Sequence, residues 1–320
     1  MIMAIDQGST KTSVVFVSPN GKIAASAETG GACYFISGVD AAFNEIQNAL
    51  EKSGVKQKDI TRIFGGIAGA NWSDEIEMLT KEFQTRFGVR DVSVCNDCVP
   101  ALRGGTDKQN GIVLCAGTGF NGAVMTDGII RHVFNNYVDA ADQGGGALGG
   151  RALTAVFESF LGIRDKTILT QTLMDYFGYN EIDQLILGRD RGRLRHPVKT
   201  IAPIVADAAF KNDSVALDVI REFSESIARY AQGSLKKFDL TGKDCDIVLS
   251  GGVFKSEHSL FMETISAQVH SVSSQAHVVN AKFEPVVGAA LFGLNEAGAS
   301  QEVLETCRQS ASESGFLRIK

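Results

Sequence analysis

Two short segments combine glycine with hydroxyl side chains, a composition suited to binding phosphate groups. Their glycines let backbone N–H groups come close to phosphate oxygens, and the hydroxyls add further donors. Either segment by itself could be an ordinary hairpin turn. Both occur at the same point of two similar folding units, which favours a pair of loops that clamp phosphate. The residues are Gly8, Ser9, Thr10, Lys11 and Thr12 in the first segment and Gly117, Thr118 and Gly119 in the second.

Acidic residues follow two apolar segments in the first third of the chain. Asp6 comes directly after the first apolar run, and Asn96 and Asp97 come after residues 92–95. A carboxylate in a partly desolvated site can orient a hydroxyl group for in-line attack on phosphorus. Asn96 and Asp97 could instead cap a helix that begins near Cys98. At this point the residues leave both interpretations open.

The elements that would position these residues form a β-β-β-α-β-α-β pattern. Apolar residues run together or alternate in the expected strands, and they recur at helical spacing in the expected helices. Turn residues at 18–21 join the second strand to the third. The expected strands cover residues 2–5, 13–17, 22–26, 60–64 and 92–95, with helices over 39–50 and after Ser73.

The same pattern restarts near residue 112, and this internal repeat sets the predicted architecture. A second three-strand meander is followed by a largely helical section, a buried strand, and then a helix, a strand and a helix. The repeat predicts an α/β protein built from two similar halves. The expected strands are 112–116, 123–125, 129–133, 246–250 and 277–279, and the expected last helix is 285–297.

Composition and charge narrow the possible partners. The 320 residues are 44% hydrophobic and 21% charged, as in ordinary globular proteins, and the formal net charge of −6 argues against nucleic acid as the main partner. No apolar run is long enough to span a bilayer, and Asp6 stands too near the start for a signal peptide. The six cysteines are scattered and do not suggest a disulfide framework. We therefore expect a cytoplasmic protein with no membrane partner.

Five motifs in a fixed order resemble the sugar kinase/Hsp70/actin superfamily, in particular the branch that holds the N-acetylglucosamine kinases and the BadF/BadG/BcrA/BcrD ATPases. The resemblance runs from Met1 to about Leu294. It implies two RNase H-like lobes of the actin/hexokinase type around a central cleft. We expect the lobes at 1–109 and 110–320, with the option that the last helix packs back on the first lobe. The motifs are residues 6–12, 96–97, 116–122, 142–153 and 250–254.

The resemblance also implies roles for individual residues. Asp6 resembles the aspartate that holds Mg²⁺, usually through water, and Asp97 resembles the base that accepts the proton of a sugar hydroxyl. Asp142 resembles an acidic residue that contacts sugar hydroxyls. The two glycine segments would hold the phosphates of ATP, with Lys11 either at a phosphate or exposed on the turn. Further binding residues are Gly251 and Gly252 for adenosine, and Gly69, Ala70, Asn96 and Gly144 for the sugar.

The sugar is less closely defined than the reaction. Cys33 stands where N-acetylhexosamine kinases commonly carry an asparagine, and the loss of one amide contact can change the sugar that is accepted. Trp72 could stack on a sugar face or simply pack. We predict an ATP-dependent kinase for N-acetylglucosamine or glucosamine, acting at the 6-hydroxyl; N-acetylmuramic acid and other polyols stay open as acceptors. A homodimer is the family expectation.

Two other functions could use the same fold. An ATPase that activates a partner enzyme would hydrolyse ATP without sugar, and activators of the BadF type hold an iron–sulfur cluster. None of the six cysteines fits well near the second glycine-rich region, where we expect the cysteines of such a cluster, and Cys95 and Cys98 lack a second pair for zinc. A non-catalytic sensor would bind its ligand without turnover. The four arginines between 189 and 195 predict a solvated loop or edge strand, or else a basic ribbon for an acidic partner.

Overall fold

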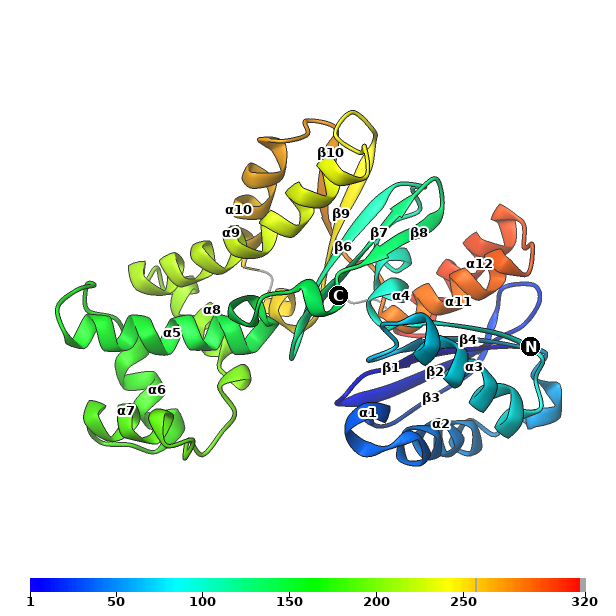
Figure 1. Cartoon of the computed structure of the whole chain (residues 1–320), viewed down its shortest axis with the longest axis horizontal. Helices are drawn as coiled ribbons and strands as arrows, with labels where there is room; N and C mark the ends of the chain where they lie inside the picture. The colour runs from blue at the N-terminus through cyan, green and yellow to red at the C-terminus, as the bar shows by residue number, and fades with distance from the viewer. Residues whose placement is uncertain (257, 317–320) are drawn as a thin grey trace. The chain divides into compact units, whose positions relative to one another are not determined.

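The computed structural model describes residues 1–256 and 258–316. Two five-stranded sheets, each with helices, carry an α/β fold (Figure 1). The chain forms two compact units: unit 1 comprises Met1–Val113, Gly122–Val133 and the segment from Ala281 onward, and unit 2 comprises Leu114–Asn121 and Phe134–Asn280. The predicted division near residue 110 separates the two sheets along the sequence. The compact units follow spatial contacts and join the last two helices to the first sheet.

The first sheet belongs to unit 1 and has the strand order β3-β2-β1-β4-β5. The first three strands form an antiparallel meander, and β4 and β5 continue the sheet in parallel from β1. Parallel strands end at the same edge, so side chains after β1, β4 and β5 gather there. The bounds are β1 (Ile2–Gln7), β2 (Lys11–Val17), β3 (Ile23–Gly30), β4 (Arg62–Ile67) and β5 (Asp91–Asn96).

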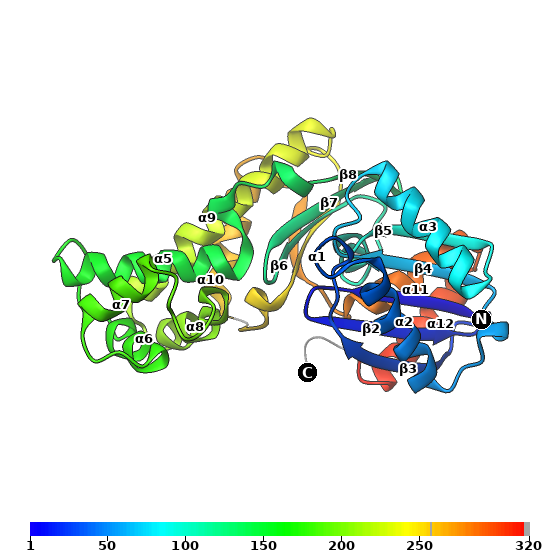
Figure 2. The same ribbon diagram turned by 60° about the horizontal axis from the view of Figure 1, so that its bottom comes forward.

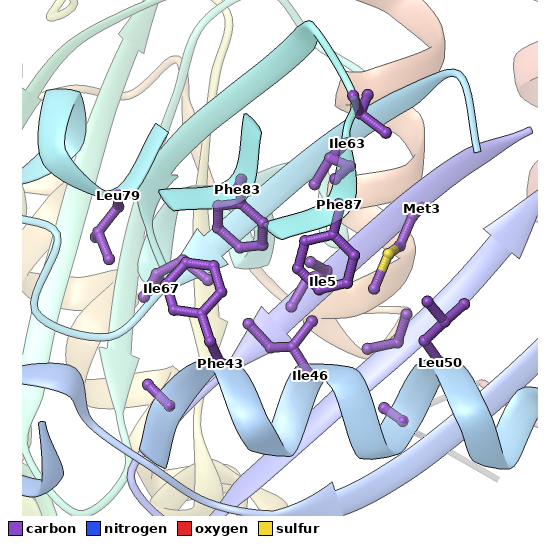
Figure 3. Packing of buried hydrophobic residues seen from close by; sticks show 14 of the residues in the cluster. Met3, Ile5, Phe43, Ile46, Leu50, Ile63, Ile67, Leu79, Phe83 and Phe87 are labelled. Carbon is purple, nitrogen blue, oxygen red and sulfur yellow. The ribbon is translucent and has the colours of Figure 1, made fainter. Parts of the chain in front are cut away.

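Helices cover both faces of this sheet, which explains why its central strands are nearly continuous apolar runs. Figure 3 shows Phe43 and Ile46 of α2 pointing toward Phe83 of α3 and Ile5 of β1, and all four side chains are buried. On the other face, α11 packs on alternate strand residues, with the Phe292 ring stacked on Phe64 at a centroid distance of 5.6 Å. Figure 2 shows α2 and α3 on one side of the strands and α11 and α12 on the other. The helices of unit 1 are α1 (Tyr34–Ser37), α2 (Val39–Ser53), α3 (Ser73–Phe87), α4 (Cys98–Arg103), α11 (Pro285–Glu296) and α12 (Gln301–Glu313).

Glycine ends the two helices that build this core. Gly54 and Gly88 adopt left-handed backbone conformations directly after α2 and α3, with φ of 74° and 67°. A residue without a Cβ takes that conformation at little cost and lets its N–H bond the last turn of the helix. Both helices therefore end where the sequence places glycine.

The second sheet has the order β10-β9-β6-β7-β8, which repeats the order of the first sheet when it is read from β8. β7 and β8 pair antiparallel, and β9 and β10 pair in parallel. The predicted internal repeat is thus confirmed at the level of strand order. The bounds are β6 (Gly111–Ala116), β7 (Phe120–Thr126), β8 (Ile129–Val133), β9 (Cys245–Ser250) and β10 (Ala276–Asn280).

The helices of unit 2 include the longest of the described chain, α9, whose apolar stripe is buried while its other face is polar. α9 packs against α5, α8 and α10. Asp213 caps its start, because its side chain accepts a hydrogen bond from the N–H of Ala216. The helices are α5 (Gly144–Phe160), α6 (Leu169–Phe177), α7 (Ile182–Asp190), α8 (Ala202–Phe210), α9 (Ser214–Lys237) and α10 (Ser259–His270).

Short 3₁₀ segments complete the chain: η1 (Gln57–Asp59), η2 (Asn135–Tyr137), η3 (Ala140–Asp142), η4 (Val198–Thr200) and η5 (Gly252–Ser256). The predicted β-β-β-α-β-α-β order of the first half and the α/β class are confirmed. No helix in the described part of the chain is long and apolar enough to cross a membrane.

Candidate active site

The first glycine segment is the tight turn between β1 and β2. The N–H of Gly8 donates to the carbonyl of Lys11 at 2.9 Å, which closes the turn, and Ser9 and Thr10 are exposed. The Thr12 hydroxyl is buried; it donates to the carbonyl of Gly30 and accepts from Gln7, at 2.9 and 3.2 Å. Thr12 therefore holds the turn from inside, and Ser9 and Thr10 carry the hydroxyls that face solvent.

Two neighbours define the surroundings of this turn. Lys11 forms an ion pair with Glu28 at 3.0 Å across the β2–β3 hairpin. Gly31 passes so close behind the turn that a Cβ there would overlap the backbone of Thr10. The turn is thus backed by main chain on one side, while Ser9 and Thr10 on its exposed side carry hydroxyls that can donate to phosphate.

Asp6 and Asp97 lie around the half-buried Cys95 at the carboxyl edge of the first sheet. Asp6 of β1 is aligned with Gly66 of β4, and Gly66 is aligned with Cys95 of β5. Burial raises the pKa of the Cys95 thiol most, and the negative charges of Glu296, Asp97 and Asp6 raise it further. The structure therefore brings two of the predicted carboxylates to the same part of the sheet.

Asp97 is free of the capping role that its position allowed. It precedes α4 without any side-chain cap hydrogen bond, and Asn96 accepts from the N–H of Cys98 at 3.0 Å instead. Burial raises the pKa of Asp97 to about 6, against the opposing effect of the backbone N–H groups of Asp97 and Cys98. A carboxylate with a pKa close to neutral is well suited to accept a proton.

The loop of residues 68–72, which joins β4 to α3, holds the predicted Gly69 and Ala70. Gly69 has a φ of +87°, which favours glycine, and Ala70 is buried. Asn71 is linked to the carboxyl edge of the sheet, because the amide of Asn96 donates to its side-chain oxygen at 2.8 Å. Sequence reasoning did not single out Asn71. Its place directly after the glycine-rich end of a strand was the available signal.

The second glycine segment joins β6 to β7 and is closed in the same way as the first. The N–H of Gly117 donates to the carbonyl of Gly119 at 2.9 Å, and Thr118 is exposed. The start of α5 docks directly on this turn: the N–H of Gly145 donates to the carbonyl of Gly117 at 2.8 Å. Gly144, with a φ of +49°, lies where a Cβ would overlap the carbonyl of Gly119. The turn and the helix start are therefore built as one backbone surface.

A third glycine segment, which follows β9 in the chain, lies next to this backbone surface. Gly251 has a φ of +100°, and a Cβ there would overlap the backbone of Ala116 at the end of β6. Gly252 follows at the start of η5 and is exposed. Three segments far apart in sequence thus bring bare backbone together at the ends of β6 and β9. A ligand with several anionic oxygens suits such a surface, because α5 also directs its positive N-terminal end there.

Asp142 is engaged inside unit 2. Its carboxylate is 1% exposed and accepts hydrogen bonds from Arg151, Arg229 and Tyr230 at 3.2, 2.9 and 3.0 Å. Burial acts to raise the pKa of this carboxyl, but hydrogen bonds from Ser226, Tyr230 and Arg151 outweigh burial and hold the pKa below its usual value. A sugar hydroxyl would have to compete with these partners for the Asp142 oxygens.

Metal binding by protein ligands alone has no support in the described residues, which contain no group of three or more His, Cys, Asp or Glu side chains placed to hold an ion. Magnesium is commonly held in another way, through one or two carboxylates, waters and substrate phosphates. Asp6, half-buried at the end of β1 and one residue from the Gly8 turn, fits that arrangement. All six cysteines are free thiols.

Comparison with known sequences supports a family assignment. The model of the "BadF/BadG/BcrA/BcrD ATPase family" matches residues 4–293. An N-acetyl-D-glucosamine kinase of Dictyostelium discoideum is 24% identical over 314 residues, covering 92% of this chain and 98% of the relative. An N-acetylmuramic acid/N-acetylglucosamine kinase of Clostridium acetobutylicum is 24% identical over 227 residues, covering 68% of this chain and 72% of the relative.

Comparison with solved structures supports the fold. A ROK family glucokinase from Streptomyces griseus, solved in complex with glucose and AMPPNP, superposes with a TM-score of 0.63. The two chains are 19% identical, and the match covers 92% of this chain and 99% of the glucokinase. The predicted actin/hexokinase-type architecture is therefore confirmed.

Proposed function

Because the chain belongs to the BadF/BadG/BcrA/BcrD ATPase family, we propose that it is an ATP-dependent kinase that phosphorylates a hexosamine-type sugar, N-acetylglucosamine or glucosamine, at the 6-hydroxyl. The relatives that are named as N-acetylhexosamine kinases support this acceptor class. The observation that carries the proposal is the environment of Asp97. Asp97 directly follows a parallel strand, its side chain does not cap the next helix, and its pKa is raised to about 6.

Asp97 acts as the general base in this proposal. Its carboxylate accepts the proton of the acceptor hydroxyl while the hydroxyl oxygen forms a bond to the γ-phosphorus. The bond between that phosphorus and the bridging oxygen of ADP breaks in the same step, and the proton leaves Asp97 for solvent afterwards. Asp6 would hold Mg²⁺ through water, and the ion would neutralise charge on the phosphates.

The glycine segments hold the nucleotide in this proposal. The turn at Gly8–Thr12 and the turn at Gly117–Gly119 direct backbone N–H groups and hydroxyls to the phosphates. The Gly251-Gly252 turn lies against the adenosine. Fixed backbone dipoles stabilise the charge that spreads over the phosphoryl oxygens without having to reorganise during the reaction.

Release of ADP tests the proposed function. Wild type and Asp97→Asn are assayed with Mg·ATP and a panel of N-acetylglucosamine, glucosamine, N-acetylmuramic acid, N-acetylmannosamine and glucose. We expect release that depends on one or two of the sugars and falls by a factor of about 10²–10⁴ in the variant. Asp59→Asn is the matched control, because Asp59 is an exposed aspartate of the same unit.

Two results would contradict this function. Hydrolysis at the same rate with and without sugar would support an ATPase that activates a partner, and ligand binding without any turnover would support a sensor. NMR of the phosphorylated product identifies the hydroxyl that received the phosphate. The homodimer and the cytoplasmic location stay predictions, and sedimentation and cell fractionation check them.

A further inference from the structure

Tyr34 and Glu75, which lie outside the 68–72 loop, help to hold it in place. The Tyr34 hydroxyl donates to the carbonyl of Gly69 at 2.8 Å. One carboxylate oxygen of Glu75 accepts from the N–H groups of both Asn71 and Trp72, each at 2.9 Å. The second contact is a capping-box arrangement, in which a glutamate in the first turn of a helix bonds back to the residues before it. The loop is therefore fixed at its middle and at its end.

Hydrogen bonds link the 68–72 loop to Asn96 and, through Asn96, to Cys98, the two residues that flank Asp97 in the chain. The Asn71 side chain accepts from Asn96 at 2.8 Å, and Asn96 in turn accepts from the N–H of Cys98 at 3.0 Å. Asn96 is 3% exposed, so it has little freedom to find other partners. A continuous series of hydrogen bonds thus runs from Glu75 through Asn71 and Asn96 to Cys98.

The Tyr34 contact does not titrate near neutral pH. Burial raises the pKa of Tyr34, and the hydrogen bond and negative charge of Glu75 raise it further, so the phenol keeps the proton that it donates. The neighbouring Cys33 donates from its thiol to the carbonyl of Ala68 at 3.5 Å, and burial raises the pKa of that thiol as well. The Tyr34 hydroxyl and the Cys33 thiol therefore both keep their protons near neutral pH.

We propose that Tyr34 and Glu75 are positioning residues for the acceptor sugar: they fix the 68–72 loop so that Asn71 and Trp72 form a preset acceptor surface beside Asp97. This inference rests on the proposed kinase function and adds residues to the same site. Neither Tyr34 nor Glu75 touches the sugar. Because the loop is already fixed, sugar binding loses less conformational entropy than it would if the loop had to become ordered on binding.

The chemistry of the loop indicates what part of the acceptor it contacts. Trp72 is 46% exposed, and Phe35, which lies against Gly69, is 62% exposed. Aromatic faces suit the C–H surface of a sugar ring, and the Asn71 backbone and side chain are polar beside them. The loop therefore suits an uncharged ring face with polar groups at its edge.

Trp72 is the only tryptophan of the chain, so its fluorescence reports on this loop alone. Wild type, Glu75→Ala, Glu75→Gln and Tyr34→Phe are titrated with N-acetylglucosamine and with glucosamine, and KM is measured for the sugar and for Mg·ATP. We expect Glu75→Ala to raise the sugar Kd and KM by about tenfold to a hundredfold, as the loss of buried hydrogen bonds would. Glu75→Gln should recover part of this loss, because its amide oxygen still accepts. KM for Mg·ATP should change less than about twofold in every variant.

Glu77→Ala is the matched control. Glu77 lies on the same helix two residues further on, is exposed, and pairs only with Lys81 in the described contacts. An unchanged sugar Kd in both Glu75→Ala and Tyr34→Phe would overturn the proposal. A parallel rise of KM for sugar and for Mg·ATP together with a large fall in Tm would also overturn it, since that pattern means general loosening. A wild type whose Trp72 fluorescence and ADP release both ignore every sugar would refute the kinase function itself, and the positioning role with it.

Discussion

Asp97 of unit 1 and Asp142 of unit 2 show opposite uses of one residue type. Asp97 is half-buried and pairs with no cation among the described residues, and its pKa is raised to about 6. Asp142 is almost fully buried between Arg151, Arg229 and Tyr230, and its pKa is lowered. A carboxylate surrounded by donors is stabilised as an anion and is a poor base, whereas one that lacks such partners is ready to accept a proton.

The glycine turns of the two units also differ, both in the contacts that hold them and in the space they leave for a Cβ. Around Gly8 the turn is held by the Thr12 hydroxyl, and a Cβ at Gly8 would make only an ordinary contact, 3.6 Å from the carbonyl of Lys11. Around Gly117–Gly119 the turn is held by the backbone at the start of α5, and a Cβ at Gly144 would overlap the carbonyl of Gly119. A Cβ at Gly251 would likewise overlap the backbone of Ala116, directly before the turn. The Gly8 turn of unit 1 thus tolerates a Cβ, whereas in unit 2 the backbone packing excludes a Cβ at Gly144 and Gly251 but leaves open space at Gly117.

The largest expected difference concerns turnover by variants of the two aspartates. Asp97→Asn should lower kcat by a factor of about 10²–10⁴ and leave the fold intact. Asp142→Asn should instead lower the free energy of unfolding by about 1–3 kcal/mol, because buried donors lose a charged partner. Steady-state kinetics and thermal melts on both variants measure this. A large rise in sugar KM for Asp142→Asn without any change in Tm would show that Asp142 contacts the sugar directly.

The next largest effect is expected at the crowded glycines. Gly144→Ala and Gly251→Ala place a Cβ against backbone at positive φ, and we expect each to cost about 1–3 kcal/mol or more and to weaken ADP binding. Gly117→Ala meets open space within unit 2, so its fold should persist. Calorimetric titration with ADP and thermal melts distinguish the crowded variants Gly144→Ala and Gly251→Ala from the uncrowded Gly117→Ala. Weaker ADP binding at unchanged Tm in Gly117→Ala would support the phosphate role of this turn, and unchanged binding would refute it.

A smaller effect concerns the pH dependence of stability. The folded-state pKa of Asp97, about 6, lies above its usual value, so the folded state binds more protons than the unfolded state between about pH 4 and 6. Stability is therefore lost as pH rises through that window. Asp97→Asn lacks this loss and should melt at a higher temperature than wild type at pH 8, with no difference at pH 4. The lowered pKa of Asp142 has the opposite sign: its contribution is present above its usual pKa and is lost as pH falls through the folded-state value. Equal melting temperatures of wild type and Asp97→Asn at both pH values would contradict the raised pKa.

The smallest effect is expected at Gly150, in the middle of α5. A Cβ there meets nothing within 4 Å, and alanine is favoured over glycine inside a helix. Gly150→Ala should therefore raise the free energy of unfolding by about 0.5–1 kcal/mol without changing KM. Denaturant titration measures the gain. A loss of stability would mean that the helix is not packed as described.

The strand pattern, the internal repeat and the glycine turns could be predicted from the sequence, because they depend on local composition and periodicity. It did not reveal the partners of Asp142, since Arg229 and Tyr230 come from α9, more than eighty residues away. It also predicted that the Thr12 hydroxyl donates to phosphate, whereas the structure buries this hydroxyl and has it donate to the carbonyl of Gly30. Glu75 had a local signal in its spacing from the start of α3, yet the backbone groups that it accepts from became clear only in three dimensions.

The place of α11 in unit 1 has a consequence for the order in which the protein forms during translation. This helix covers one face of the first sheet through contacts with Ile2 and Phe64, but it is encoded at residues 285–296. The whole of unit 2 must therefore be synthesised before α11 can pack on the first strands. We expect unit 2 to complete its core first. Until the final tenth of the chain has emerged, the face of the first sheet that α11 later covers stays accessible to proteases and can bind chaperones.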